Sequence, residues 1–159
     1  MNLTLICVGR LKENYLRDAC SEYQKRLSGF CRFNIEELEA ERLPDDPSDA
    51  EIAAALEKEG ERILRKIPRG AYTAALCIEG KELSSEELAQ LMESVPVLGS
   101  GAAAFIIGSS YGLSDRVKSA AQLKLSMSRM TFPHQLARVM LMEQIYRAYS
   151  ILNNRKYHK

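Results

Sequence analysis

The residues best suited to chemistry stand in the last third of the chain, where a short apolar run ends in a glycine–serine turn. This turn, Gly108-Ser109-Ser110-Tyr111-Gly112, matches the G-x-S-x-G pattern that presents a nucleophilic serine between a strand and a helix. The chain order Ser110, Asp115, His134 would supply a triad. Asp115 nevertheless follows Ser110 so closely that it cannot easily orient a distant imidazole. A serine hydrolase using Ser110 is therefore only a minor alternative.

Basic residues gather in the same third of the chain. From Arg129 onward there are six Lys/Arg against one acid, whereas the preceding residues hold 16 Lys/Arg and 20 Asp/Glu. The formal net charge of +1 thus hides a polarised molecule, and this polarity predicts an anionic partner at one end. The basic tail, residues 153–159, also carries Tyr157 and His158, which could stack on bases beside phosphate contacts.

Two further side chains in this region leave alternatives open. Arg138 falls within the apolar sweep of a predicted long helix, where a guanidinium is costly unless it is paired or turned toward an anion. A carboxylate partner and a role at the substrate are both compatible with this position. His134 follows Pro133 in the first helical turn, a place that favours ordering the loop by hydrogen bonds over acting as a base.

Composition excludes several classes of protein. A chain of 159 residues with 46% hydrophobic and 27% charged residues is typical of one soluble globular domain, here residues 1–159 with 153–159 as its tail. Four cysteines without C-x-x-C spacing predict reduced thiols, and two histidines without a cysteine cluster predict no metal. Without a signal peptide or a membrane-length apolar run, we expect a cytoplasmic protein with no membrane partner.

Strand and helix periods alternate along the chain, which predicts an α/β fold. The expected strands are Leu3–Val8, Phe33–Leu38, Ala71–Ile78, Ala102–Ile107 and Leu123–Ser126. A Ser84-x-x-Glu87 capping box opens one of the helices between them, and Pro96 with Gly99 should end it. This order favours a mostly parallel sheet with helices on both faces.

Ligands of such sheets bind at the carboxyl ends of the strands. Three loops are candidates there: 76–81, 108–112 and 127–132. Glycine in the first two allows close backbone approach, and the third runs into a helix N-terminus, which favours an anionic or acceptor group. Neither a G-x-G-x-x-G nor a P-loop is present, which argues against a dinucleotide or nucleoside-triphosphate site of those types.

The expected terminal helix is apolar on nearly every side between Leu136 and Leu152, with Glu143 and Arg147 placed to pair at i, i+4. The sheet can cover only one side of it. A second subunit is the natural cover for the other side, so we predict a two-fold homodimer, with burial under other helices of the same chain as the alternative.

Several segments together resemble the RlmH family, small methyltransferases of the SPOUT class that act on large-subunit ribosomal RNA. The resemblance rests on 5–12, 105–113, 125–138, 143–148 and the closing Tyr157-His158-Lys159, and it extends over essentially the whole chain. The block Met-Thr-Phe-Pro-His-Gln-Leu-Ala-Arg (130–138) is the most specific part. Two departures are Ser109, where the family often has glycine, and the absence of a proline before Tyr157.

The resemblance implies a deep C-terminal trefoil knot, a homodimer, and S-adenosylmethionine bound in the knot. It also implies methylation of N3 of a pseudouridine in the helix 69 loop of 23S rRNA on the assembled ribosome. Carried over by motif, the cofactor-binding residues would be Leu76, Gly108, Met127, Ser128, Arg129, Met130, Thr131 and Phe132. The substrate-side, catalytic candidates would be Arg138, Tyr157, His158 and Lys159, with the tail serving the other subunit. A ribosome-associated binding or assembly factor without chemistry is the alternative function.

Overall fold

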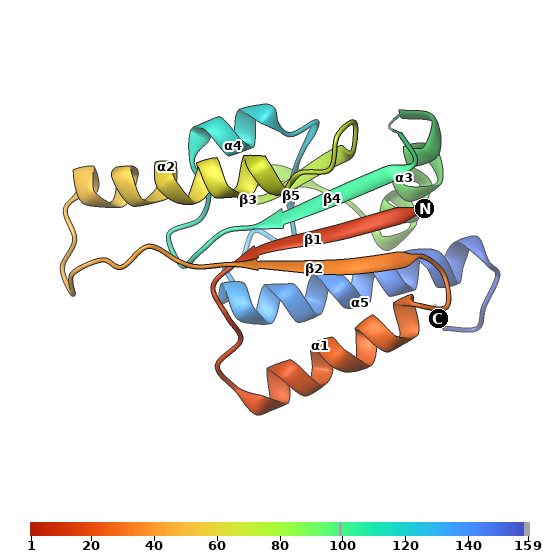
Figure 1. Cartoon of the computed structure of the whole chain (residues 1–159). Helices are drawn as coiled ribbons and strands as arrows, with labels where there is room; N and C mark the ends of the chain where they lie inside the picture. The colour runs from red at the N-terminus through yellow and green to blue at the C-terminus, as the bar shows by residue number, and fades with distance from the viewer. Residues whose placement is uncertain (99, 158–159) are drawn as a thin grey trace.

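The computed structural model describes residues 1–98 and 100–157, and strands alternate with helices throughout (Figure 1). The strands are β1 (Asn2–Val8), β2 (Arg32–Leu38), β3 (Tyr72–Glu82), β4 (Ala102–Ile107) and β5 (Leu123–Ser126). The helices are α1 (Asn14–Leu27), α2 (Asp49–Lys66), α3 (Ser85–Leu98), α4 (Asp115–Ala120) and α5 (His134–Leu152). The predicted α/β alternation is confirmed.

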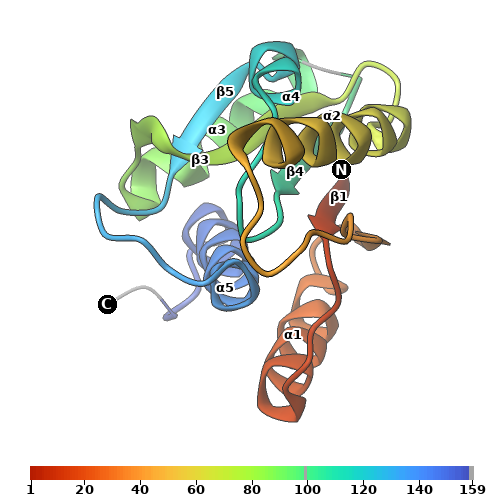
Figure 2. The ribbon, with the colours of Figure 1, turned by 90° about the vertical axis from the view of Figure 1, so that its left-hand side faces the viewer.

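The described strands form a single parallel sheet in the order β2-β1-β4-β3-β5. Figures 1 and 2 show α1, α3 and α5 on one face and α2 with α4 on the other. Each face has its own core: the first includes Leu3, Phe105 and Leu141, and the second includes Ile6, Ile63 and Val117. Because both faces are covered, β4 can be apolar at every position, as its sequence AAAFII is.

The start of α3 follows its local sequence closely. The Ser84 hydroxyl accepts from the Glu87 amide at 3.1 Å, and the Glu87 carboxylate accepts from the Ser84 amide at 2.7 Å, which completes the predicted capping box. The prediction that Pro96 ends this helix was wrong: Pro96 lies inside α3, which continues to Leu98. A proline costs the helix one backbone hydrogen bond, which does not stop the chain from completing its last turn. Gly99, the other predicted stop, lies outside the described residues.

The strand β3 was predicted too short. Both Leu76 and Lys81 are register partners of Leu125 in β5, so residues 77–80 loop out and the strand then resumes to Glu82. The candidate loop 76–81 is therefore an excursion within a strand, not a connection after it.

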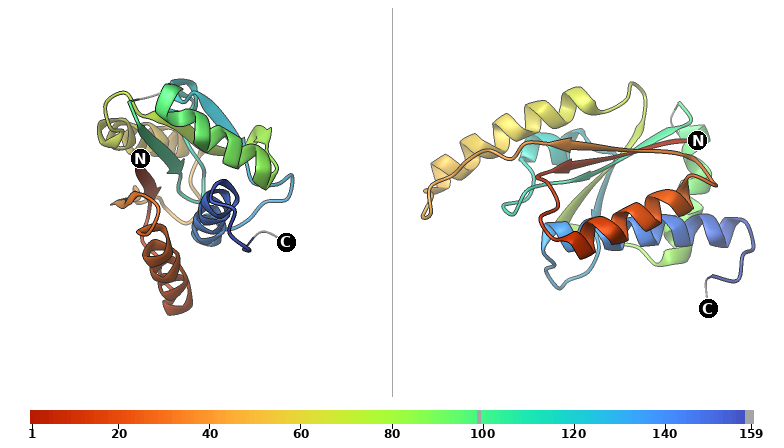
Figure 3. Two further views of the ribbon diagram at one scale, coloured as in Figure 1. Left: turned by 90° about the vertical axis from the view of Figure 1, so that its right-hand side faces the viewer. Right: turned by 60° about the horizontal axis from the view of Figure 1, so that its bottom comes forward.

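The helix α5 lies between α1 and α3 under the sheet (Figure 3). Leu141, Met142 and Ile145 are fully buried against these neighbours. The opposite strip remains partly open, since Leu136 is 38% exposed and Met140 is half-buried. Helices of the same chain thus cover much of α5, and the strip of Leu136 and Met140 stays partly exposed.

Candidate functional site

The strand order places the three predicted ligand loops next to one another. In the sheet, β4 lies beside β3 and β3 lies beside β5, so the turn after β4, the excursion of β3 and the segment after β5 follow in sequence along one edge. Figure 2 looks toward these strand ends, and the long segment between β5 and α5 runs down the left-hand side of the view. Adjacent strand ends in a parallel sheet form the usual position of a ligand site.

The turn after β4 is compact. The Gly112 amide donates to the Ser109 carbonyl at 2.9 Å, and Gly112 has a φ of +85°, which favours glycine. A Cβ added to Gly108 would lie 2.1 Å from the Gly112 carbonyl oxygen, so no side chain fits there. Ser110 and Tyr111 are left exposed at the tip.

The β3 excursion is pressed against β5. A Cβ on Gly80 would lie 2.7 Å from backbone atoms of Lys124 and Leu125, which explains the glycine. Glu79 pairs with Lys118 of α4 at 2.6 Å, and this hydrogen bond lowers the pKa of the carboxyl. The excursion is thereby held against α4 by Glu79 and against β5 by Gly80.

The segment between β5 and α5 is ordered by two serines. Ser126 donates to the Ser128 carbonyl at 3.0 Å, and the Ser128 hydroxyl accepts from the Met130 amide at 3.0 Å. Each of the three loops also exposes one large apolar side chain: Ile78 (65%), Tyr111 (47%) and Met130 (73%). Close backbone, hydroxyls and exposed apolar side chains are suited to a small ligand with an apolar body and hydrogen-bonding edges, such as an adenosyl group.

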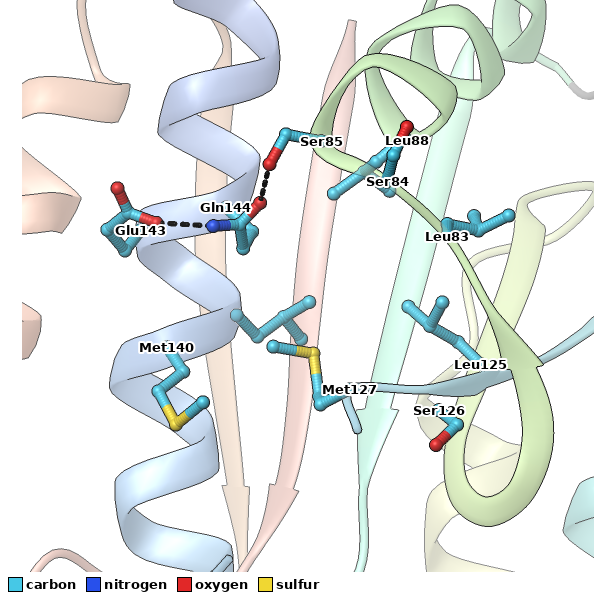
Figure 4. Close-up of a pocket in the computed structure, with 11 residues that line it drawn as sticks. Leu83, Ser84, Ser85, Leu88, Leu125, Ser126, Met127, Met140, Glu143 and Gln144 are labelled. Carbon is cyan, nitrogen blue, oxygen red and sulfur yellow. Dashed lines mark hydrogen bonds between the residues drawn. The ribbon is translucent and has the colours of Figure 1, made fainter. Parts of the chain in front are cut away.

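A groove of about 420 Å³ lies beside this edge, between the start of α3, the end of β5 and α5 (Figure 4). Of the predicted cofactor residues, only Met127 lines it. Ser85 donates to the Gln144 side chain at 2.6 Å, and Met140 faces the same space. The groove therefore adjoins the predicted cofactor loops without coinciding with them, and it contains part of the open strip of α5.

Arg138 has the carboxylate partner that the sequence left open. It is 2% exposed, and its guanidinium donates to Glu37 at 2.6 Å and to the Gly9 carbonyl at 2.8 Å. Its buried Nε has no partner among the described residues. Arg138 thus ties the start of α5 to the ends of β1 and β2.

His134 and Gln135 contact the same loop after β1. The Gln135 side chain accepts from the Lys12 amide at 3.0 Å, and His134 Nε2 lies near the Gly9 backbone. Burial, with the positive charges of Arg138 and Lys12, lowers the pKa of His134. A neutral, half-buried imidazole at this contact agrees with a role in ordering the loop.

Tyr157 lies far from the three loops of its own chain. Its hydroxyl donates to Glu143 at 3.2 Å, and the Arg147 guanidinium lies 4.9 Å from its ring centroid. The predicted i, i+4 pair is confirmed, with Arg147 Nε 3.0 Å from Glu143. Burial, the largest cause, raises the pKa of the Tyr157 hydroxyl. His158 and Lys159 lie outside the described residues.

The hydrolase alternative gains no support from the geometry. Within residues 1–98 and 100–157, no hydrogen bond or ion pair joins Ser110 to Asp115 or His134. The nearby Ser114 hydroxyl is used instead to cap α4, accepting from the Val117 amide at 3.3 Å. The described residues also contain no group of three or more His, Cys, Asp or Glu placed to hold a metal, and none of their helices could cross a membrane.

Sequence reasoning missed two acids at this edge. Glu37 alternates with Phe33 and Ile35 on the face of β2 that points toward the core shared with α1 and α5, so its position on an apolar face was a usable signal. Glu59 is buried in α2 at helical spacing from Ala55 and Ile63, and the same signal applies to it.

A parallel sheet with helices on both faces defines an α/β protein, and its three adjacent loops, after β4, within β3 and after β5, form a candidate small-molecule site. A family model described as "Predicted SPOUT methyltransferase" matches residues 1–158, and the chain belongs to this family.

The chain is also similar to individual proteins of known name. The chain is 50% identical over 159 residues, the full length of both chains, to the Ribosomal RNA large subunit methyltransferase H of Clostridioides difficile (strain 630) and to that of Clostridium novyi (strain NT). It is 47% identical over the same full length to a putative enzyme of that name from Methanococcus maripaludis. The crystal structure of tRNA (m1G37) methyltransferase from Aquifex aeolicus superposes with a TM-score of 0.56 at 10% identity, covering 92% of this chain and 70% of that one, which shows the shared fold alone.

Proposed function

We propose that this protein is an S-adenosylmethionine-dependent methyltransferase that modifies 23S rRNA in the large ribosomal subunit, at N3 of a pseudouridine in the helix 69 loop. The observation that carries the proposal is full-length identity of 50% to proteins named Ribosomal RNA large subunit methyltransferase H. The adjacency of the three loops supports it independently, because strand order was not used to select them.

The residues that would hold the methyl donor are Leu76, Gly108 and 127–132. We propose that the segment from Met127 to Phe132 lies within a trefoil knot in a single domain spanning residues 1–159, where its backbone and that of Gly108 face the donor. S-adenosylmethionine supplies an electrophilic methyl group when bound. Because displacement at a sulfonium needs little covalent help, these residues would act mainly by orienting donor and acceptor.

The substrate side of the proposal falls to the C-terminal tail. N3 of pseudouridine carries a proton that must leave, and His158 is our candidate acceptor, with Lys159 favouring the deprotonated base. Arg138 could add positive charge, although its contacts with Glu37 and Gly9 already give it a positioning role.

We further propose a homodimer in which each tail completes the site of the other subunit. About 13 residues of α5, or roughly 20 Å, separate His134 at the sheet edge from Arg147 at Tyr157. The tail is thus remote from the loops of its own chain. Two copies of α5, packed antiparallel through the strip of Leu136 and Met140, would bring each tail to the partner's loops.

Methyl transfer to ribosomes tests the function directly. The purified protein is incubated with labelled S-adenosylmethionine and 70S ribosomes, 50S subunits or free 23S rRNA from cells lacking the gene, and the label is mapped by mass spectrometry. We expect one methyl group, in helix 69, on assembled ribosomes. Binding of ribosomes without donor binding in calorimetry would instead support the assembly factor.

Mixing inactive variants tests the shared site. His158→Ala should reduce turnover without changing donor affinity, and Lys156→Ala in the same tail is the matched control. Gly108→Ala should remove donor binding. If the tail acts across the dimer, random pairing of the two inactive variants restores about a quarter of the wild-type rate, since half the dimers then have one complete site. No recovery would show that each chain uses its own tail.

A further inference from the structure

The C-terminal tail is held against the body of its own chain close to its end. The last residues of a chain are poorly ordered unless packing or hydrogen bonds hold them. Here the chain turns back after α5 toward the end of α1, and Tyr157 is half-buried there (Figure 1). The contacts that hold Tyr157 come from side chains to which no role has been given so far.

The backbone of the tail reverses direction at Asn154. This residue has a φ of +51°, in the left-handed region that asparagine adopts more readily than most residues. The Arg155 amide then donates to the Ser150 carbonyl at 2.9 Å, and the Tyr157 amide donates to the Arg155 carbonyl at 2.8 Å. The Arg155 guanidinium lies 4.4 Å from the ring centroid of Phe30. These contacts direct Tyr157 back onto α5.

The hydroxyl of Tyr157 is bonded to a carboxylate that is itself fixed. It donates to Glu143 Oε1 at 3.2 Å, and Arg147 Nε donates to the same oxygen at 3.0 Å. Glu143 Oε2 accepts from the Gln144 side chain at 2.8 Å (Figure 4). The Glu143 side chain is 19% exposed, so water screens these charge-assisted hydrogen bonds only in part.

The ring of Tyr157 is held on two sides. The Arg147 guanidinium lies 4.9 Å from its centroid, a cation–π distance. The Tyr146 ring lies 4.7 Å away, centroid to centroid, at an interplanar angle of 75°, which is the favoured edge-to-face arrangement. Glu143, Tyr146 and Arg147 follow one another at i, i+3 and i+4, so one turn of α5 presents all three on the same side. We call these three residues the tyrosine clamp.

We propose that Glu143 and Arg147 are positioning residues, which hold Tyr157 in the tyrosine clamp and thereby set where the end of the tail meets the RNA. This inference rests on the proposed function, in which His158 accepts the N3 proton. Tyr157 anchors the tail in this arrangement, because its hydroxyl is already bonded to Glu143. Neither Glu143 nor Arg147 touches the substrate, and both act on the tail of their own chain, whichever subunit that tail serves.

The expected size of the effect follows from the reach of the chain. Consecutive Cα atoms are about 3.8 Å apart, so holding Tyr157 restricts the position of the residue that follows it. Released at Asn153, the rest of the tail would spread over roughly 12–15 Å. The imidazole would then spend a smaller fraction of its time at the reacting proton, which we expect to lower kcat about tenfold.

The test compares Glu143→Ala with the conservative Glu143→Gln. The amide oxygen of glutamine can still accept from Tyr157 and Arg147, whereas alanine loses both hydrogen bonds. We expect Glu143→Ala to lower kcat on ribosomes about tenfold, with the Kd for S-adenosylmethionine within about twofold of the wild type, and Glu143→Gln to stay within about threefold in kcat. Arg147→Met should lower kcat about fivefold, and it serves as the second variant if Glu143→Ala does not fold.

Trypsin provides a measurement on the free protein that does not depend on the proposed function. It cuts after Arg155 and Lys156, which requires the tail to leave the body of the protein. We expect Glu143→Ala and Arg147→Met to speed the loss of the last residues about tenfold, as followed by mass spectrometry. Ile145→Val is the matched control. It loosens the core of the same helix, and its aliphatic side chain takes no part in the hydrogen bonds or ring contacts of Tyr157. It should change neither tail cleavage nor kcat.

A double variant separates positioning of the tail from a general structural role. If Glu143 acts only through the tail, Glu143→Ala combined with His158→Ala is no slower than His158→Ala alone, whereas independent effects multiply. The inference is overturned if the two effects multiply, if Glu143→Ala and Arg147→Met leave tail cleavage unaltered, or if Ile145→Val alters it equally. A wild type that methylates no ribosomes would refute the proposed function instead, and trypsin cleavage would still decide whether the clamp holds the tail.

Discussion

Breaking the ion pair between Arg138 and Glu37 should destabilise the protein asymmetrically. The Arg138 side chain is 3% exposed and the Glu37 side chain is 41% exposed. Removing one partner of a fully buried pair costs about 3–5 kcal/mol, because the other charge is left without compensation. In Glu37→Ala the buried guanidinium of Arg138 keeps only its hydrogen bond to the Gly9 carbonyl. Since water reaches this pair from the glutamate side, we expect a reduced loss of about 2–3 kcal/mol.

Replacing the arginine should cost less. In Arg138→Met the side chain keeps much of its volume, the unpartnered Nε disappears, and Glu37 can turn to water. The remaining loss of stability is about 1 kcal/mol, because the Gly9 carbonyl loses its hydrogen-bond donor. Glu36→Ala is the matched control, because Glu36 points to the other face and pairs with Lys66 near the surface at 3.0 Å. Its expected cost is below about 1 kcal/mol.

Urea denaturation at one fixed protein concentration measures these free energies of unfolding, since association would otherwise shift them. The corresponding fall in Tm for Glu37→Ala is about 4–12 °C. The double variant should cost less than the sum of the single ones, because both remove the same contact. Two results would refute this reasoning. One is a larger loss of stability in Arg138→Met than in Glu37→Ala, and the other is a double variant whose loss equals the sum of the two single losses.

Three other predictions concern the turn, the buried acid and the capping box. Gly108→Ala should abolish donor binding in calorimetry because its Cβ would lie 2.1 Å from Gly112, whereas Gly101→Ala, at φ +75° in open space, should cost only about 1 kcal/mol of stability. Burial raises the pKa of Glu59 above 4.5, so the folded state binds the carboxyl proton more tightly than the unfolded state does. The wild type therefore loses stability as the pH rises above 4.5. Because glutamine does not ionise, Glu59→Gln should gain stability relative to the wild type over this pH range, which urea titrations from about pH 4 to 8 measure. Ser84→Ala should cost about 1 kcal/mol in the same assay, because the Glu87 amide loses its acceptor.

Elements with strong local signals were predictable from the sequence. The bounds of β4 and β5 are as predicted, because an unbroken apolar run between turn residues specifies a buried strand without knowledge of its neighbours. The capping box at Ser84 is likewise a contact within four residues. The candidate loops 108–112 and 127–132 followed from the same signals, since their places depend only on where β4 and β5 end.

The elements that were predicted wrongly depend on distant residues. The resumption of β3 at Lys81 exists because Leu125 and Ser126 of β5 offer a second stretch of pairing, more than forty positions along the chain. The local pattern Glu79-Gly80-Lys81 gives no sign of it and is typical of a loop. The position of Tyr157 beside Glu143 also depends on a distant residue, since its hydroxyl lies 3.5 Å from that of Tyr23 in α1.

Arg138 and Glu59 show which contacts the sequence does not predict and what further information would predict them. Placing Arg138 on an apolar helix face predicts that it needs a partner, and the same holds for Glu59, but burial cost alone does not identify the partner. Glu37 is 101 positions away from Arg138. Strand order supplies the missing step, because β1 lies between β2 and β4 and so brings the ends of these three strands together. From that point, Glu37 and Gly9 are the groups within reach of the start of α5.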